Sequence, residues 1–147
     1  MQLGMIGLGR MGGNMVRRLR RGGIDVAGHT RDVEETRELA RETGMVAATS
    51  PAELVAALAA PRVVWLMLPA GDVTEQYVRR MHELLEPGDI VVDGANSYFK
   101  DSMLRASLLG ERRIQFVDAG VSGGVWGLAE GYALMVGGPR SAVALLE

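Results

Sequence analysis

Short, largely apolar runs alternate with amphipathic stretches along the chain. Residues 63–68 and 90–93 are apolar almost without interruption, which is typical of parallel strands covered on both faces. Residues 11–21 instead repeat apolar side chains at helical spacing. The apolar face of this stretch carries Met11, Met15, Val16 and Leu19. The period of the pattern therefore switches between strand and helix.

The pattern predicts seven strands and six helices. The strands are expected at residues 2–6, 24–28, 45–48, 63–68, 90–93, 114–118 and 132–136. The helices are expected at residues 11–21, 32–43, 51–60, 73–85, 101–109 and 141–147. Because strands and helices alternate, we expect an α/β fold with a doubly wound, mostly parallel sheet and helices on both of its faces.

A glycine-rich turn joins the first predicted strand to the first predicted helix. It reads Gly7-Leu8-Gly9-Arg10-Met11-Gly12, the G-x-G-x-x-G pattern of dinucleotide-binding folds. In that pattern the first glycine permits the tight turn, the second lets a pyrophosphate approach the backbone, and the third lets the helix pack close to the strand. Free N–H groups at the helix start then face the anion. Since the turn lies between strand and helix, we expect it to bind a dinucleotide and residues 1–147 to form a dinucleotide-binding domain. A purely structural turn is the alternative.

Composition narrows the possible functions. A net charge of −2 gives no electrostatic case for binding nucleic acid or an anionic membrane. Cysteine is absent, which excludes thiolate metal sites, and His29 and His82 are too far apart in sequence to suggest a metal site. No apolar run approaches the length of about 18 residues that spans a bilayer. The chain begins on its first predicted strand without a signal-peptide pattern, so we expect a cytoplasmic protein.

The end of the second predicted strand bears on the choice of cofactor. An acidic residue there binds the ribose 2′-hydroxyl of NAD, whereas an arginine accommodates the 2′-phosphate of NADP. Asp32 lies 20 residues after Gly12, which fits the NAD spacing. However, residues 32–35 also have the pattern of a capping box that opens the next helix, and we favour that role for Asp32. Thr30 and Arg31 would then face the adenine ribose, which favours NADP slightly over NAD; an Arg31 that points into solvent is the alternative.

Three later strands also run into loops suited to a ligand. These loops are Pro69-Ala70-Gly71, Gly94-Ala95-Asn96-Ser97 and the glycine-rich residues 119–127. Ligands of open α/β sheets bind outside the carboxyl ends of the strands. The backbone N–H groups of Ser122 to Gly124 could form an anion-binding nest. Loops that only turn the chain are the alternative.

Three stretches resemble the amino-terminal domain of the 6-phosphogluconate dehydrogenases, within the wider β-hydroxyacid dehydrogenases. Residues 7–15 are similar to the cofactor motif of the wider group. Residues 93–102 resemble the Asp-Gly-Gly-Asn-Ser loop of the phosphogluconate enzymes and its following Asp-Ser, although Ala95 replaces the second glycine. Residues 118–124, with Gly127 and Gly131, resemble the shared substrate loop. The resemblance covers the whole chain.

Two further stretches, residues 68–71 and 125–127, look most like the shorter bacterial form of that enzyme. That form often uses NAD, which weakens the preference for NADP. The cofactor is therefore expected to be NADP or NAD, with a slight preference for NADP.

The resemblance implies a role for each candidate site residue. The pyrophosphate would be held by Gly7, Leu8, Gly9, Arg10, Met11 and Gly12. The adenine ribose would meet Thr30, Arg31 and Asp32, and the rest of the cofactor would be lined by Leu68, Pro69 and Ala70. Asn96 would lie between nicotinamide and substrate. The substrate would also be bound by Ser122, Gly123 and Gly124.

The resemblance also implies a reaction. The family oxidises the C3 hydroxyl of 6-phosphogluconate by hydride transfer, and the 3-keto acid loses carbon dioxide to give ribulose 5-phosphate in the pentose phosphate pathway. The chemistry needs a base and an acid. The family uses a lysine and a glutamate for these roles, both in stretches beyond residue 147, and Lys100 matches neither.

We therefore expect no catalytic residue within this chain and little turnover by the chain alone. The helical carboxyl-terminal domain of the family, which completes the substrate pocket and a homo-oligomer, is absent from it. Two alternatives stay open: a related dehydrogenase of the 3-hydroxyisobutyrate type, and a non-catalytic nucleotide-binding module.

Overall fold

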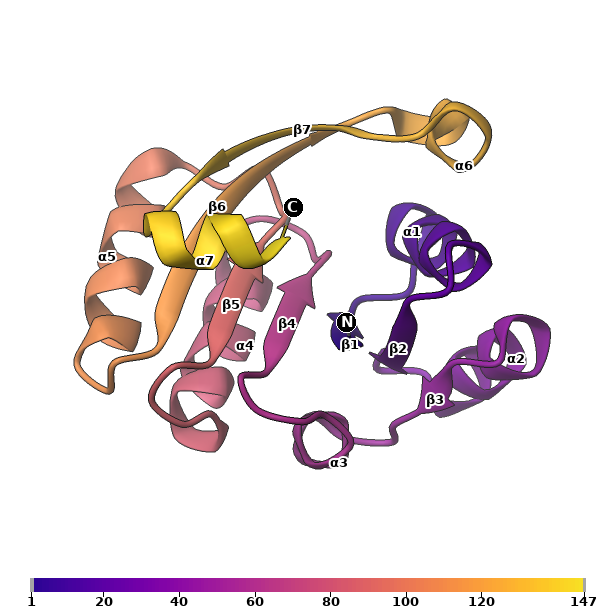
Figure 1. Ribbon diagram of the computed structural model, residues 1–147, viewed down its shortest axis with the longest axis horizontal. Coiled ribbons are helices and arrows are strands. Elements are labelled where there is room, and N and C mark those ends of the chain that lie inside the picture. Colours follow the sequence, from indigo (N-terminus) through magenta and orange to yellow (C-terminus); the bar gives the residue numbers. More distant parts are fainter. Residues whose placement is uncertain (1, 147) are drawn as a thin grey trace.

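Within residues 2–146, which the computed structural model describes apart from the Val125 side chain, seven strands form one sheet (Figure 1). The strands are β1 (Gln2–Ile6), β2 (Asp25–His29), β3 (Val46–Ala47), β4 (Val63–Leu66), β5 (Ile90–Asp93), β6 (Gln115–Ser122) and β7 (Ala133–Gly137). Their order is β3-β2-β1-β4-β5-β6-β7, with every pair parallel except β6 and β7. The first six follow the order of two βαβαβ halves, which confirms the predicted doubly wound, mostly parallel α/β sheet.

Helices cover both faces of this sheet (Figure 1). They are α1 (Arg10–Arg21), α2 (Val33–Thr43), α3 (Pro51–Ala56), α4 (Asp72–Leu84), α5 (Phe99–Gly110), α6 (Gly127–Glu130) and α7 (Arg140–Leu146), with a 3₁₀ turn, η1, at Gly124–Trp126. Side chains of α1, α2 and α7 belong to one apolar cluster, and those of α3, α4 and α5 belong to a second. The sheet therefore separates two cores.

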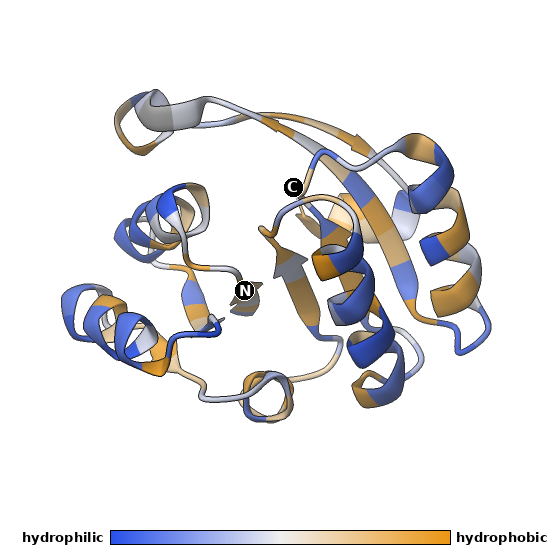
Figure 2. Cartoon of the chain, turned by 180° about the vertical axis from the view of Figure 1, so that it is seen from behind, coloured by the Kyte–Doolittle hydropathy of each residue, from blue (hydrophilic) through white to orange (hydrophobic). Residues whose placement is uncertain are grey.

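The central strands are buried from both sides. On β4, Trp65 belongs to the first cluster and Leu66 to the second, and the same alternation places Val92 and Val91 of β5 on opposite faces. Because both faces are covered, these strands are apolar at nearly every position rather than at every second one. Figure 2 shows the apolar strands enclosed by helices that carry many hydrophilic residues, although α5 also exposes Phe99, Met103 and Leu104.

Polar side chains cap the starts of two helices, and the cap at Asp32 forms as the sequence predicts. Asp32 precedes α2, and its Oδ1 accepts hydrogen bonds from the backbone N–H groups of Glu34 and Glu35. The Ser50 hydroxyl accepts a bond from the backbone N–H of Glu53 at the start of α3. The Glu53 carboxylate accepts bonds from the hydroxyl and the backbone N–H of Thr49, at 2.6 and 2.8 Å, which lowers its pKa.

The structure corrects the glycine-rich loop predicted at residues 119–127. Residues 119–122 extend β6, because β7 returns antiparallel and pairs with it from Asp118↔Gly137 to Ser122↔Ala133. Other differences are shifts of element ends: β4 stops at Leu66 rather than residue 68, α3 stops at Ala56, and α5 begins at Phe99. Among the helices of residues 2–146, none combines the length and apolar character that crossing a membrane requires.

Candidate functional site

The carboxyl ends of four strands lie in register along one edge of the sheet. Ile6 pairs with His29 of β2 and with Leu66 of β4, Leu66 pairs with Asp93 of β5, and Asp93 pairs with Asp118 of β6. The loops that follow β1, β2, β4 and β5 therefore begin side by side. The structure thus brings four of the predicted loops to one edge, as expected for an open α/β sheet.

The predicted Ser122 loop is placed differently. The strand β6 continues for four residues beyond Asp118, which pairs with the last residue of β5. At about 3.3 Å per residue, this extension carries Ser122 roughly 13 Å past the edge. Ser122, Gly123 and Gly124 therefore project from the β6–β7 hairpin above the other loops.

The glycine turn between β1 and α1 is shaped by contacts that leave no room for side chains. Gly7 has φ +94°, and a Cβ there would lie 2.2 Å from the Met67 carbonyl oxygen. A Cβ at Gly12 would lie 1.9 Å from the Gly7 carbonyl oxygen. The tight turn and the close contact between helix and strand are therefore both present as the sequence predicts.

Gly9 is different, because no atom would lie within 4 Å of its Cβ. It is the N-cap of α1, with φ −61°, and no side chain caps the helix. The first N–H groups of α1 have no partner within the helix and no capping side chain, and the position of a Cβ at Gly9 beside them is open. Such a cradle of backbone donors fits a pyrophosphate, because the helix dipole adds to their attraction for an anion. Of the remaining turn residues, Leu8 is buried in the core, Met11 is partly buried and Arg10 is exposed.

In the loop after β2, the Asp32 side chain caps α2, as described above. The buried Thr36 hydroxyl accepts a hydrogen bond from the backbone N–H of Thr30 and donates one to the Asp32 carbonyl oxygen. The Arg31 side chain is exposed between these two residues. The loop is thus held from below by Thr36 and presents Arg31 outward.

The loop after β4 is held by the following helix. The Thr74 hydroxyl donates to the Pro69 carbonyl oxygen at 2.8 Å. Leu68 packs against the second apolar cluster, whereas Pro69 and Ala70 are exposed. The predicted cofactor-lining residues therefore lie on a fixed loop with two of them open to solvent.

Asn96 connects the loop after β5 to the hairpin. Its Oδ1 accepts from the Val121 backbone N–H at 3.0 Å, and its Nδ2 donates to the Val121 carbonyl oxygen at 3.4 Å. Asn96 has φ +53°, a left-handed conformation that asparagine tolerates better than most residues. The side chain thus pairs with β6 as a backbone group would. A cavity of about 390 Å³ lies beside it, lined by Asn96, Ser97, Asp118, Gly120, Met135, Val136 and Gly137.

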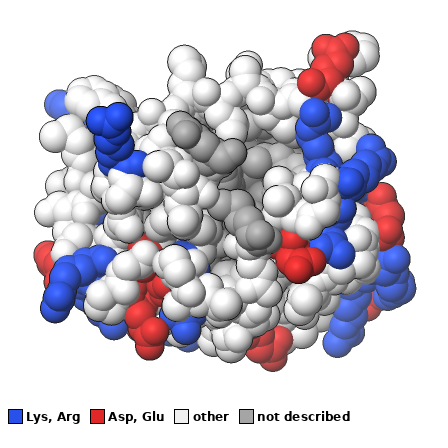
Figure 3. All heavy atoms as spheres, viewed as in Figure 1, with Lys and Arg blue, Asp and Glu red and all other residues white. Residues whose placement is uncertain are grey.

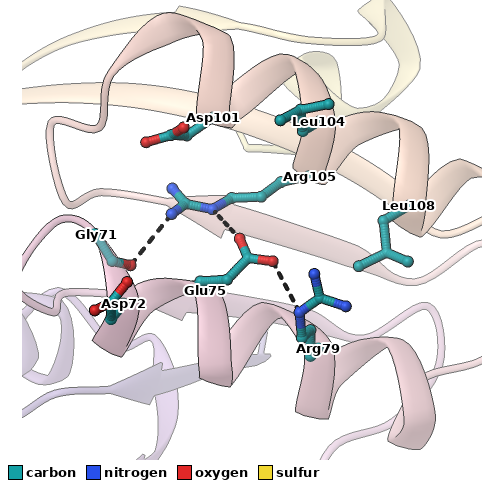
Figure 4. A pocket seen from close by; sticks show the side chains of 8 residues that line it. All are labelled: Gly71, Asp72, Glu75, Arg79, Asp101, Leu104, Arg105 and Leu108. Atoms are coloured by element: carbon teal, nitrogen blue, oxygen red, sulfur yellow. Dashed lines mark hydrogen bonds and ion pairs between the residues drawn. The ribbon is translucent and has the colours of Figure 1, made fainter.

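A buried arginine that no sequence motif indicated connects two of these loops. The side chain of Arg105 on α5 is 2% exposed and lies against a cavity of about 400 Å³ between α4 and α5 (Figure 4). Its Nη1 donates to Asp93 Oδ2 at 3.0 Å and to the Ser97 hydroxyl at 2.8 Å. Its Nε donates to Glu75 Oε2 at 3.0 Å, and its Nη2 to the Gly71 carbonyl oxygen at 3.3 Å. One guanidinium therefore joins the loop after β4 to the loop after β5.

Asp93 is the fixed point of this network. It ends β5 with a fully buried side chain, and it also accepts hydrogen bonds from the Ala95 backbone N–H and the Ser97 hydroxyl. A charge that ends a buried apolar strand needs a partner, and this was the available sequence signal. Among the described residues, no group of three or more His, Cys, Asp or Glu is arranged to hold a metal ion.

Two arginines near the end of α1, Arg17 and Arg20, pair with carboxylates of the same domain. Arg17 donates twice to the Glu42 carboxylate at 2.7 Å, and these bonds lower the pKa of Glu42. Arg20 pairs with Asp25 at 2.6 Å. Figure 3 shows basic and acidic side chains interspersed over this side of the molecule.

A protein-family model, described as the NAD binding domain of 6-phosphogluconate dehydrogenase, matches residues 2–147. The chain belongs to this family. This match confirms the resemblance of the sequence to the amino-terminal domain of the 6-phosphogluconate dehydrogenases. The individual roles of its site residues stay predictions.

Three similar proteins are each more than twice as long as the part that this chain matches. The NAD(+)-dependent, decarboxylating 6-phosphogluconate dehydrogenase of Haloferax volcanii is 40% identical over 95% of the chain and 46% of its own length. The Plasmodium falciparum 6-phosphogluconate dehydrogenase, solved apo and with NADP+ or 6-phosphogluconate, is 28% identical with a TM-score of 0.92, over 99% of this chain and 32% of that one. The 3-hydroxyisobutyrate dehydrogenase of Mycobacterium tuberculosis is 29% identical with a TM-score of 0.88, over 99% and 49%. The chain spans less than half the length of each.

Proposed function

We propose that the chain is the cofactor-binding domain of an NAD(P)-dependent enzyme that oxidises 6-phosphogluconate and decarboxylates it to ribulose 5-phosphate. The observation that carries this proposal is the open cradle at Gly9, on the same edge as Asn96 and below the hairpin that bears Ser122. Membership in the 6-phosphogluconate dehydrogenase family supports the choice of substrate.

The cofactor half of the site lies on β1, β2 and β4. The pyrophosphate would accept hydrogen bonds from the first N–H groups of α1, beside the turn from Gly7 to Gly12. The adenine ribose would meet Thr30, Arg31 and the Asp32 backbone, and the Leu68, Pro69 and Ala70 loop would line the cofactor. When bound, the nicotinamide would accept the hydride that leaves the C3 carbon of the substrate.

The substrate half lies on β5 and the hairpin. Asn96 would lie between nicotinamide and substrate, where its carboxamide orients the reacting carbon while Val121 holds it in place. Ser122, Gly123 and Gly124 would bind the substrate from above, and Gly123 and Gly124, at φ +146° and +48°, can turn their N–H groups toward an anion.

In the same proposal, the groups that transfer protons during the reaction are not residues of this chain. A base must accept the hydroxyl proton and an acid must protonate the enediol. Lys100 is the single lysine of the sequence and is exposed on α5. We propose that a helical domain of the natural protein supplies both groups and the contacts of a homo-oligomer, so that the chain alone binds cofactor without turning over substrate.

Gly9→Ala tests the cradle. The added methyl group fills the space in front of α1, so the Kd for NADP and NAD, measured by calorimetry, should rise about tenfold or more. The melting temperature should fall by no more than about 4 °C, because nothing contacts the Cβ and the loss is limited to the poorer N-cap that alanine makes. Gly110→Ala is the matched control, since its Cβ also meets no atom, far from the site. Wild-type binding of neither cofactor at millimolar concentration would overturn the proposed function.

Arg31→Ala tests the preference for NADP. If the exposed guanidinium pairs with the 2′-phosphate, the variant should lose about tenfold or more in NADP affinity. Its affinity for NAD should change less than about twofold, because NAD carries a hydroxyl there. Equal losses for the two cofactors would contradict this role of Arg31.

A dehydrogenase of the 3-hydroxyisobutyrate type is the second candidate. The similarity to the Mycobacterium tuberculosis enzyme favours it at the level of the fold. The Asn96 loop, which resembles that of the phosphogluconate enzymes, favours the first candidate. Steady-state kinetics of the natural protein with 6-phosphogluconate and with 3-hydroxyisobutyrate separates the two, and a higher kcat/KM for 3-hydroxyisobutyrate would reverse the choice.

A further inference from the structure

The far end of the β6–β7 hairpin lies against α1, the helix that begins at the glycine turn (Figure 1). The chain leaves β6 at Ser122, forms η1 and α6, and returns into β7. Only two short segments of 3₁₀ and α-helix, three and four residues long, make up this tip within the described residues. Such short segments have little stability of their own, so contacts with α1 must hold their position.

Arg18 supplies the polar part of these contacts. It lies on the side of α1 next to α6, and its Nη1 approaches the Leu128 and Ala129 carbonyl oxygens at 3.5 and 3.4 Å. These are two of the last carbonyl groups of α6, which have no partner within the helix. The guanidinium also lies beside Gly131, where a Cβ would be 3.1 Å from Nη2 and 3.3 Å from Cζ. Glycine at this position therefore makes room for the Arg18 head group.

Tyr132 supplies the apolar part. A Cβ at Gly127 would lie 2.2 Å from the Tyr132 ring, and a Cβ at Gly123 would lie 3.0 Å from it, so the backbone of the tip rests directly on this ring. The ring packs against the apolar cluster that contains Met15 and Val16 of α1. The tip is thereby fixed to α1 at two places, by Arg18 and by Tyr132.

We propose that Arg18 is a positioning residue that holds the Ser122–Gly124 loop over the cofactor turn. It touches neither ligand in this proposal. It fixes the tip to α1, whose first turn would bind the pyrophosphate, so that the substrate-binding and cofactor-binding backbones keep one relative position. The inference rests on the proposed function for its kinetic consequence but not for its structural one.

The structural consequence is measured by amide hydrogen exchange of the natural protein that carries this chain. In Arg18→Ala, exchange over residues 123–132 should quicken about fivefold to tenfold, the effect of losing one charged hydrogen-bond donor. Exchange in β1 and β5 should not change. Arg18→Lys keeps the charge but cannot span both carbonyls, so it should restore part of the protection. Arg21→Ala, at an exposed position on the last turn of the same helix, is the matched control and should match the wild type.

The kinetic consequence is a split between substrate and cofactor. Arg18→Ala should raise KM for 6-phosphogluconate about tenfold and change KM for the cofactor less than about twofold, with partial rescue by Arg18→Lys. Unchanged exchange at the tip, or equal losses for substrate and cofactor, would overturn the inference. A wild-type protein that binds neither cofactor, yet shows faster exchange at the tip in Arg18→Ala, would refute the proposed function and leave Arg18 as the anchor of the tip.

Discussion

Arg105→Ala is expected to lower the free energy of unfolding by about 3–5 kcal/mol, because it leaves the Asp93 carboxylate buried without its charged partner. Asp93 is completely buried, and the bonds from Ala95 and Ser97 do not neutralise it. Loss of the guanidinium also frees the Glu75 carboxylate and the Gly71 carbonyl oxygen. Urea unfolding monitored by circular dichroism measures the change.

Arg79→Ala is the matched control for this prediction. Arg79 binds the other oxygen of the same Glu75 carboxylate at 3.0 Å, but its side chain is 65% exposed (Figure 4). An exposed pair of this kind contributes less than about 1 kcal/mol. In the double variant Asp93→Asn with Arg105→Ala, the loss should be smaller than the sum of the two single losses, since no unpaired charge remains. A cost for Arg105→Ala no greater than that for Arg79→Ala would contradict the buried network.

Gly12→Ala is expected to destabilise the domain by about 1–3 kcal/mol or more, because the new Cβ collides with backbone that cannot rotate away. The Cβ would lie 1.9 Å from the Gly7 carbonyl oxygen, so α1 must move outward from β1. That movement displaces the N–H groups at the start of α1. Affinity for the dinucleotide should therefore fall at least about tenfold, the effect of losing one hydrogen bond to a charged group. Thermal unfolding and calorimetry report the two effects separately.

Gly9→Ala separates the effect of a collision with the backbone from the effect of adding a methyl group to the turn. Both substitutions add one methyl group to the same turn, but only the one at Gly12 meets the protein. Gly22→Ala, whose Cβ would be 3.4 Å from its nearest neighbour, controls for adding alanine at the other end of α1. A Gly12→Ala protein as stable as the Gly22→Ala control would show that the turn is looser than the structure has it.

Features fixed by neighbouring residues could be predicted from the sequence. The Gly7 to Gly12 turn, the Asp32 cap and the buried strands each depend on short spacings, so their patterns are visible locally. The position of the site could be predicted from the same patterns, because parallel strands bring their carboxyl ends to one edge of the sheet.

Contacts between distant residues could not be predicted in this way. The extension of β6 through Ser122 depends on pairing with β7, whose residues follow only after the hairpin tip. Read alone, the glycines of residues 119–127 indicate a loop. The partners of Arg105 lie 8 to 34 positions away, and Asn96 is 25 positions from Val121. Local periodicity carries no signal for such pairs, so the buried network and the Asn96 bond were found only in three dimensions.

The position of Arg105 limits how such domains can recombine. The proposed cofactor loops follow β1, β2 and β4, and the proposed substrate loops follow β5 and β6, so a crossover between α4 and β5 looks suited to exchanging one specificity without the other. The Arg105 guanidinium crosses that boundary, with Gly71 and Glu75 on one side and Asp93 and Ser97 on the other. A chimera joined there inherits the arginine from one parent and two of its acceptors, Gly71 and Glu75, from the other. A working cassette for substrate specificity would therefore begin before Gly71, so that α4 travels with the substrate half.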